Sequence, residues 1–187
     1  MDVIKVEKRD QQMKAKQLRR KGFVPGNIYG GGLKESISIQ MDEQDADRLF
    51  RTMREGSKVS LALDGRVIPT QIKEKKKDRL GNGAEHFSFQ ALTEDQKVNS
   101  IAHIFLKNGD AVPGVPEQLI FEVPFSSLPA DMVDTVTIDL EGLPAGTLLT
   151  VGDIPEFQNE KVELQIKKDS VVLRINEKKR ALSPHAE

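Results

Sequence analysis

The chain of 187 residues contains no cysteine and no tryptophan, and it has a single tyrosine. Without cysteine there is no disulfide framework, no thiolate metal site and no cysteine nucleophile. The first ten residues contain no apolar stretch of signal-peptide length, and no run approaches the ~18 consecutive apolar residues of a membrane helix. These absences favour a cytoplasmic protein that is neither secreted nor embedded in a membrane.

The sequence also has few groups suited to catalysis. Its three histidines, His86, His103 and His185, are far apart, no pair has zinc-ligand spacing, and no serine lies in a nucleophile-elbow context. Three glycines at residues 30–32 follow a predicted strand, but the Gly-Lys-Ser/Thr pattern of a phosphate loop does not come after them. We therefore expect a protein that is not an enzyme and that carries no cofactor or metal.

Charge is abundant, and it is divided unevenly along the chain. The totals of 28 Lys and Arg against 29 Asp and Glu give a formal net charge of -1. Residues 1–92 carry 19 basic and 13 acidic side chains, whereas residues 93–187 carry 9 basic and 16 acidic ones. Such asymmetry between halves indicates that the basic half contacts nucleic acid or a membrane surface.

Hydrophobic patterning predicts a mainly β fold with few helices. The clearest helix spans residues 42–55, where Asp42 is a candidate N-cap and Ala46, Leu49 and Phe50 lie on one apolar face. The segment from Lys8 to Lys21 has only two sizeable apolar residues, so we expect a loop or a partly helical, solvent-facing arm. Strands are predicted at residues 3–6, 27–29, 36–40, 58–63, 66–73 and 86–92. This order is typical of a small β-barrel with one helix.

A polar stretch at residues 93–97 marks the predicted domain boundary. Beyond it, six prolines separate short apolar runs, which favours turns and sheet edges over helices. Strands are predicted at residues 98–106, 118–124, 135–140, 147–151 and 162–175, the last with a break near Asp169. We therefore expect a basic β-barrel domain over residues 1–93, an acidic β-rich domain over residues 94–176 and a disordered tail over residues 177–187.

Two basic clusters are the strongest chemical signals. The first forms the predicted arm and consists of Lys8, Arg9, Lys14, Lys16, Arg19, Arg20 and Lys21. The second follows a predicted strand and consists of Lys73, Lys75, Lys76, Lys77 and Arg79. Cations held close together repel, and an anionic partner such as an RNA backbone relieves that repulsion. A solvated surface arm and a polar hairpin end are the alternatives.

His86 and Tyr29 are the polar aromatic candidates beside these clusters. A histidine next to phenylalanines is usually half-buried and hydrogen-bonded, but its ring can also contact a base edge. Tyr29 is either an aromatic residue of the barrel wall or a ring and hydroxyl offered to a base or ribose.

Several segments resemble the bacterial ribosomal protein L25 family. Residues 18–31, LRRKGFVPGNIYGG, resemble its basic-arm-to-strand signature, and Glu7-Lys8-Arg9 resembles its opening motif. Residues 128–143, LPADMVDTVTIDLEGL, and residues 146–154, GTLLTVGDI, resemble the extra C-terminal domain of the family's longer, general-stress-protein (Ctc) members. The two matches are separate, in the family's order, and cover most of residues 3–175.

The resemblance implies a structural, ribosome-associated protein of the large subunit whose N-terminal barrel binds 5S rRNA. Binding is expected around loop E, through a widened minor groove, with neighbouring ribosomal proteins as further candidate partners. The acidic C-terminal domain is not expected to be the main RNA-binding surface. Carried over by position, with Arg20 added for its charge and proximity, the RNA-binding candidates are Arg9, Lys14, Lys16, Arg19, Arg20, Tyr29, Lys73 and His86.

The sequence departs from the family pattern at several of these places. Lys16 replaces an arginine and loses the planar fork of the guanidinium. Ser88 replaces the carboxylate of a His-x-Asp-Phe motif, which removes an acceptor for the guanine amino group in the minor groove. These changes motivate an alternative, a divergent stress-linked paralogue whose 5S rRNA specificity has decayed and which acts as an accessory protein-binding module.

Overall fold

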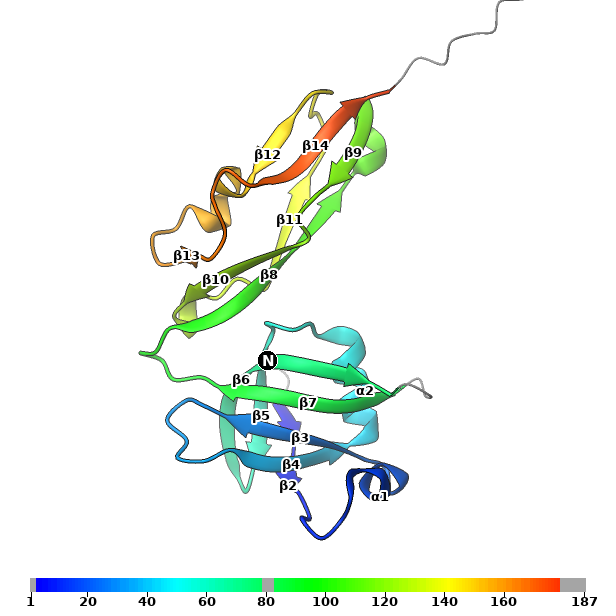
Figure 1. Ribbon diagram of the computed structural model, residues 1–187, viewed down its shortest axis with the longest axis vertical. Helices are drawn as coiled ribbons and strands as arrows, with labels where there is room; N and C mark the ends of the chain where they lie inside the picture. Colours follow the sequence, from blue (N-terminus) through cyan, green and yellow to red (C-terminus); the bar gives the residue numbers. More distant parts are fainter. Residues whose placement is uncertain (1–2, 79–82, 179–187) are drawn as a thin grey trace, which may run out of the picture. The chain divides into compact units, whose positions relative to one another are not determined.

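A computed structural model of the chain describes residues 3–78 and 83–178 (Figure 1). The chain divides into two compact units. The N-terminal unit comprises Met1–Val98 with Leu128–Ala130, and the C-terminal unit comprises Asn99–Ser127 with Asp131–Glu187. Within the described residues, both units are built mainly of β-strands, and both α-helices lie in the N-terminal unit. The predicted mainly β fold with few helices is confirmed.

Seven strands of the N-terminal unit form a nearly closed barrel (Figure 1). They are β1 (Val3–Lys5), β2 (Glu7–Lys8), β3 (Phe23–Tyr29), β4 (Ile37–Asp42), β5 (Lys58–Leu63), β6 (Arg66–Lys77) and β7 (Ala84–Ala91), paired in the order β1-β5-β6-β7-β3-β4-β2. Closure comes from the first segment of the chain, because β1 pairs with β5 and β2 pairs with β4. The backbone N–H of Val6, between them, donates to the Ala62 carbonyl at 2.9 Å. The strand predicted at residues 3–6 corresponds to β1, and the chain continues directly into β2, so these two short strands join the edges of the sheet.

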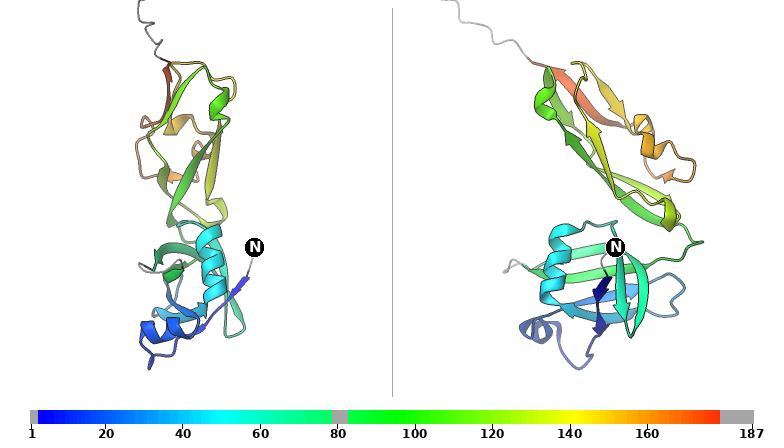
Figure 2. Two further views of the ribbon diagram at one scale, coloured as in Figure 1. Left: turned by 90° about the vertical axis from the view of Figure 1, so that its right-hand side faces the viewer. Right: turned by 180° about the vertical axis from the view of Figure 1, so that it is seen from behind.

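The longer helix, α2 (Glu43–Thr52), lies across one end of the barrel strands (Figures 1 and 2). The carboxylate of Asp42 accepts from the Gln44 N–H at 2.9 Å and caps the helix, as the sequence predicts. Ala46 and Leu49 are buried in the barrel core, and the Phe50 ring meets the Phe87 ring edge-on at 6.3 Å. The helix therefore covers apolar side chains that the strands alone would leave exposed.

Part of the predicted arm is a short helix, α1 (Ala15–Arg20). Leu18 is its one buried residue and is fully enclosed, while Lys14, Lys16 and Arg20 remain exposed. One enclosed leucine fixes the helix next to β3 although the segment lacks a continuous apolar face. Its basic side chains are therefore held in place on a folded element.

β6 continues four residues beyond its predicted end at Lys73 and contains an irregularity there. Ile72 pairs with Phe89, and the register then shifts so that Glu74 pairs with Ser88. Lys73 is the extra residue of this β-bulge, which rotates the following side chains onto opposite faces. The second basic cluster is therefore part of a strand in its described portion, and the prediction that it follows the strand is wrong.

The C-terminal unit consists of two smaller sheets (Figure 1). Its strands are β8 (Val98–Lys107), β9 (Gly114–Gln118), β10 (Glu122–Ser127), β11 (Thr135–Asp139), β12 (Leu148–Thr150), β13 (Glu163–Leu164) and β14 (Val171–Glu177). One sheet has the order β11-β8-β10-β13 and the other has the order β12-β14-β9. Short 3₁₀ helices of this unit span Gly109–Ala111, Val151–Asp153 and Pro155–Phe157, and a fourth, Pro129–Asp131, has its first two residues in the N-terminal unit. Apolar side chains from both sheets, among them Phe125, Val136 and Leu173, share one core.

The strand predicted at residues 118–124 is wrong, because β9 ends at Gln118 and β10 begins at Glu122 in the other sheet. The tail is predicted to begin at residue 177, but Glu177 is the last residue of β14; from residue 179 onward the predicted tail lies outside the described residues. None of the described helices is long and apolar enough to cross a membrane.

Candidate nucleic-acid interface

Three neighbouring strands of the barrel present a polar outer face. β3 runs parallel to β7 with Asn27 opposite Ser88, and β7 runs antiparallel to β6 with Ser88 opposite Glu74. One step along the strands, His86 lies opposite Lys76. The side chains of alternate residues share one face of a sheet, so this register gathers groups that are about 60 residues apart in sequence.

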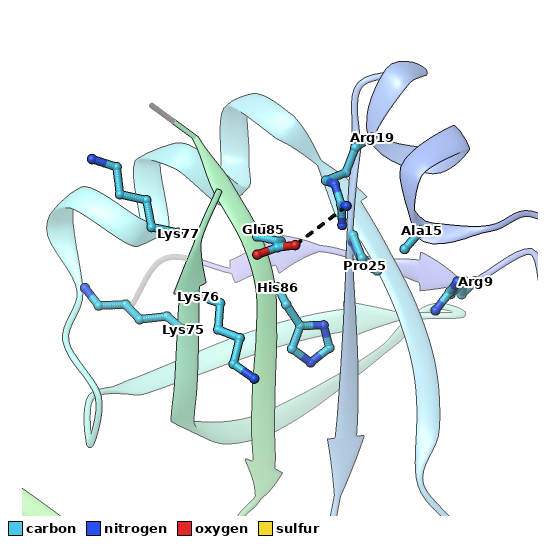
Figure 3. A pocket seen from close by; sticks show the side chains of 9 residues that line it. All are labelled: Arg9, Ala15, Arg19, Pro25, Lys75, Lys76, Lys77, Glu85 and His86. Carbon is cyan, nitrogen blue, oxygen red and sulfur yellow. Dashed lines mark ion pairs between the residues drawn. The ribbon is translucent and has the colours of Figure 1, made fainter. Parts of the chain in front are cut away.

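The outer face borders a groove of ≈ 760 Å³ beside helix α1 (Figure 3). It is lined by Arg9, Ala15, Arg19, Pro25, Lys75, Lys76, Lys77, Glu85 and His86. Arg9 directly follows β2, and the other residues come from α1 and from strands β3, β6 and β7. We call this feature the basic groove.

Positive charge dominates the basic groove. Five of its lining residues are Lys or Arg, and Glu85 is the one carboxylate among them. The Arg19 Nη2 lies 3.7 Å from the Glu85 Oε1, and both side chains are about one-third exposed. Within the part of the chain that the structure describes, no group of three or more His, Asp or Glu side chains is placed to hold a metal ion. The groove therefore suits an anionic ligand.

Arg9 is held in position by the chain around it. Its backbone N–H donates to the Ser38 carbonyl at 3.0 Å, which continues the ladder between β2 and β4. Its Nη2 donates to the Met13 carbonyl at 3.2 Å, so the loop before α1 is tied to the guanidinium. The Nε atom is buried and has no hydrogen-bond partner among the described residues. Arg9 thus links the arm to the barrel at the edge of the groove.

His86 lies in a compact hydrogen-bonded group with Asn27 and Ser88. The Nε2 atom is 3.2 Å from the Asn27 Oδ1 and 3.3 Å from the Ser88 Oγ, and the Ser88 hydroxyl donates to the same Asn27 oxygen at 2.9 Å. Burial lowers the pKa of His86, and the charges of Lys76 and Arg9 act in the same direction. Glu74 and the Pro25 carbonyl oppose them. The site therefore has a polar centre that is uncharged at neutral pH and is surrounded by cations.

Lys75 lines the groove but is engaged elsewhere. Its Nζ donates to the carbonyls of Phe50 at 2.9 Å and Met53 at 2.7 Å, and it lies 4.6 Å from the centre of the Phe50 ring. These carbonyls belong to the C-terminal end of α2, where a cation is favourable. The bulge at Lys73 produces this arrangement, because it turns Lys75 toward the helix and Lys76 toward His86.

The structure brings together three of the eight predicted RNA-binding residues in the basic groove, namely Arg9, Arg19 and His86. Lys14, Lys16 and Arg20 are exposed on or next to α1, outside the lining.

Tyr29 and Lys73 are half-buried and do not line the groove. Burial raises the pKa of Tyr29, and the charge of Glu74 adds to the effect. Burial lowers the pKa of Lys73 despite the charge of Glu55. Whether any of the eight residues contacts RNA stays a prediction.

Sequence reasoning did not assign a site role to Asn27. Asn27 belongs to the strand that leads to Tyr29, and an asparagine within a strand is a weak signal by itself. The sequence predicts that Lys76 and Lys77 attract phosphate as members of a basic run, but the run does not reveal which of its members face the groove. The bulge decides that, and the sequence pattern does not encode its position.

Comparison with known proteins agrees with the two-part organisation. The family model of the Ribosomal L25p family matches residues 4–89. The model described as Ribosomal protein TL5, C-terminal domain, matches residues 98–179. The two matches follow the order expected from the resemblance in the sequence.

Curated relatives match across both units. The "Large ribosomal subunit protein bL25" of Akkermansia muciniphila is 32% identical over 143 residues, which cover 74% of this chain and 71% of the relative. The proteins of the same name from Nitrosomonas europaea and Listeria monocytogenes are 28% and 27% identical, covering 83% and 92% of this chain and 82% and 84% of the relatives. These names describe ribosomal proteins and not enzymes, in agreement with the prediction of a non-enzymatic protein. The chain therefore belongs to the bL25 family of ribosomal proteins, in the long form that joins an L25p domain to a TL5-type C-terminal domain.

Proposed function

We propose that the chain is a structural protein of the large ribosomal subunit whose N-terminal unit binds 5S rRNA through the basic groove and helix α1. Membership of the bL25 family supports the ribosomal role. The observation that carries the RNA-binding proposal is the groove itself, whose lining joins four cations, Arg9, Arg19, Lys76 and Lys77, to His86 and so to the uncharged group that His86 forms with Asn27 and Ser88. No chemical step is part of this function.

The cations supply affinity by neutralising phosphates. Arg9 and Arg19 lie on the α1 side of the basic groove, and Lys76 and Lys77 come from β6 (Figure 3). This spacing suits contacts with phosphates on both sides of a minor groove, which in A-form RNA is wide and shallow. Each neutralised phosphate releases counterions, so affinity falls steeply as the salt concentration rises.

The uncharged centre supplies the shorter contacts. Ribose hydroxyls and base edges are both exposed in an RNA minor groove, and neutral donors and acceptors bind them without attracting phosphate. We expect the His86 ring, the Ser88 hydroxyl and the Asn27 amide to make such contacts. Tyr29 and the basic residues of α1 extend the proposed surface beyond the basic groove.

The same centre favours a second candidate, a paralogue with reduced preference for 5S rRNA. The Asn27 oxygen is within hydrogen-bond distance of both Ser88 and His86, so its capacity to accept from a guanine amino group is largely filled. A strand with a carboxylate at residue 88 would retain a free acceptor. Reduced base discrimination with retained phosphate affinity follows from that difference.

Binding titrations with bacterial 5S rRNA and with an unrelated hairpin RNA of equal length test the proposal. We expect the 5S rRNA to bind more tightly at ~150 mM salt, with a log–log salt slope of several units. Arg19→Ala should weaken binding, whereas Arg66→Ala should not. Arg66 is exposed at the other end of β6, nine residues from Lys75, or about 30 Å along an extended strand.

Undetectable binding of 5S rRNA at low salt contradicts the proposal. Equal binding of the two RNAs, with the same salt slope, supports the paralogue in its place.

A further inference from the structure

The C-terminal unit has a second groove, far from any residue of the basic groove in sequence. It has a volume of ≈ 260 Å³ and is lined by residues 136–139 of β11, by Leu149 of β12 and by residues 153–156. β11 is the outermost strand of one sheet and β12 is the outermost strand of the other. We call this feature the edge groove.

The backbone of β11 offers hydrogen bonds along the edge groove. The Asp134 carbonyl accepts from the His103 N–H at 3.0 Å, and the Leu140 N–H donates to the Lys107 carbonyl at 3.0 Å, so these even-numbered residues face β8. In a parallel pair, residues alternate in the neighbour that they face. The N–H and C=O groups of Thr135, Thr137 and Asp139 therefore point away from β8, to the open side of the sheet.

This edge lacks the usual protection against strand pairing. Exposed edges are commonly blocked by lysine, by proline or by a bulge. The sequence of β11 is TVTID, without lysine or proline, and its pairing with β8 is regular over all five residues. An extended peptide can therefore add to β11 as a further strand.

The walls of the edge groove define the side chains of such a peptide. Apolar groups of Val136, Leu149 and Ile154 form its floor, since each belongs to the core of the unit or packs against it. They accommodate an aliphatic side chain of the incoming strand. Specificity for the residues on either side comes from the rim.

The rim of the edge groove is acidic. Asp139, Asp153 and Glu156 line it, and none of the lining residues is basic. Hydrogen bonds lower the pKa of Asp139, through the Glu141 N–H and the Asn108 amide, and of Asp153, through the Thr150 hydroxyl and N–H. Each of these two carboxylates uses one oxygen in those bonds, Oδ1 in Asp139 and Oδ2 in Asp153, so among the described residues the second oxygen is left to a ligand.

We propose that the edge groove binds an extended peptide segment that adds a strand to β11, with an aliphatic side chain on the apolar floor and Lys or Arg on either side against the acidic rim. Charge complementarity selects this occupant, because three carboxylates line the site without a lining cation. The inference concerns the C-terminal unit and does not depend on RNA binding by the N-terminal unit.

Amide chemical shifts of the full-length, isotope-labelled chain provide the test, with the synthetic peptide acetyl-Gly-Lys-Val-Leu-Arg-Val-Lys-Gly-amide as the probe. We expect saturable shifts at Thr137 and Asp139 at low salt. A peptide with Glu in place of Lys and Arg should not bind, and a peptide with alternate N-methylated backbone amides should bind at least tenfold more weakly.

Protein variants separate charge from strand addition. Glu156→Gln should weaken binding of the probe peptide about two- to fivefold. Glu160→Gln, which changes an exposed carboxylate outside the edge groove, should leave binding unchanged. Thr137→Pro removes an outward N–H that no strand pair needs, so the chain should fold and the peptide should no longer bind.

Three results overturn the proposal. The first is the absence of binding at millimolar peptide. The second is equal binding of the acidic or N-methylated peptide, which remains informative even if Thr137→Pro does not fold. The third is a concentration-dependent dimer of the chain that Thr137→Pro abolishes, because it assigns the edge to a second copy.

Discussion

Lys75 and Lys76 are adjacent in β6, yet the structure gives them different roles, and replacing each with methionine separates these roles. Lys75 donates to two carbonyls at the end of α2 and contacts the Phe50 ring. Lys76 is more than half exposed and pairs with Glu74 at 3.0 Å. We therefore expect Lys75→Met to destabilise the N-terminal unit, and Lys76→Met to weaken RNA binding.

The size of the first effect follows from the contacts of Lys75. A hydrogen bond from a charged group contributes about 1.5–3 kcal/mol, and a cation at a helix C-terminus adds about 0.3–1 kcal/mol. Burial lowers the pKa of Lys75, with a further contribution from Arg54, so desolvation offsets part of this gain. A net loss of about 2 kcal/mol is expected for Lys75→Met. The exposed pair of Lys76 contributes less than about 0.5 kcal/mol.

Urea denaturation monitored by tyrosine fluorescence measures the stability of the N-terminal unit. Tyr29 is the only tyrosine, the chain has no tryptophan, and β3 belongs to the barrel. With a denaturant slope of about 1–2 kcal/mol/M, Lys75→Met should lower the midpoint by about 1–2 M, and Lys76→Met should barely change it.

RNA titrations complete the comparison of the two variants. Lys76→Met should reduce the log–log salt slope by about 0.7–0.9, the value of one phosphate contact. Lys75→Met should leave that slope unchanged under conditions in which the unit is folded. Equal losses of stability, or equal changes of slope, refute the assignment of separate roles.

Three further predictions concern the pH dependence of RNA binding through His86, the close packing of Gly26 in β3 against β7, and the linker between the two units. Burial and the charges of Lys76 and Arg9 lower the pKa of His86 in the free protein. Nearby RNA phosphates raise that pKa, so binding takes up a proton and affinity should increase about three- to tenfold as the pH falls from ~8 to ~6. Titrations should show this dependence lost in His86→Gln and kept in His185→Gln; a pH-independent wild type contradicts it. Gly26→Ala should destabilise the barrel by about 1–3 kcal/mol, because the added Cβ would lie 2.9 Å from the Phe87 carbonyl oxygen. An unchanged urea midpoint, measured by tyrosine fluorescence, would refute this prediction. We propose residues 93–97, at the end of the N-terminal unit, as the interdomain linker, and limited proteolysis should first cleave there; early cleavage elsewhere in either unit, with this stretch intact, argues against it.

The sequence predicts regular elements well where burial follows a simple period. The strand predicted at residues 58–63 has the bounds of β5, in which buried and half-buried side chains alternate at every position. Helix α2 has a capping aspartate and one apolar face, and only its ends differ from the prediction. In both cases local periodicity and tertiary burial agree.

The errors arise where tertiary contacts override the local pattern. The polar end of β6 does not resemble a strand, because Lys75 points inward and is stabilised by carbonyls of a helix that the sequence pattern does not place nearby. The apolar run at residues 119–121 looks continuous with both flanking strands, yet the chain passes there from one sheet to the other. Helix α1 depends on one enclosed leucine, which is too weak a signal for an amphipathic face.

The candidate site also has one feature that the sequence predicts and another that depends on tertiary contacts. Charge along the sequence is sufficient to predict a basic surface on the N-terminal unit. It is insufficient to predict that Asn27, Ser88 and His86 form one hydrogen-bonded group, since their contact depends on the parallel pairing of β3 with β7. Pairing between distant strands is a property of the whole barrel.

Hydroxyl-radical footprinting of bacterial 5S rRNA with the full-length chain tests the central claim most directly. We predict protection on both strands of one helical region, across a minor groove, at ~150 mM salt. The protection should weaken with Arg19→Ala and remain with Arg66→Ala. A lack of localised protection, or protection that Arg19→Ala and Arg66→Ala change equally, contradicts the assignment of the basic groove as the 5S rRNA-binding surface.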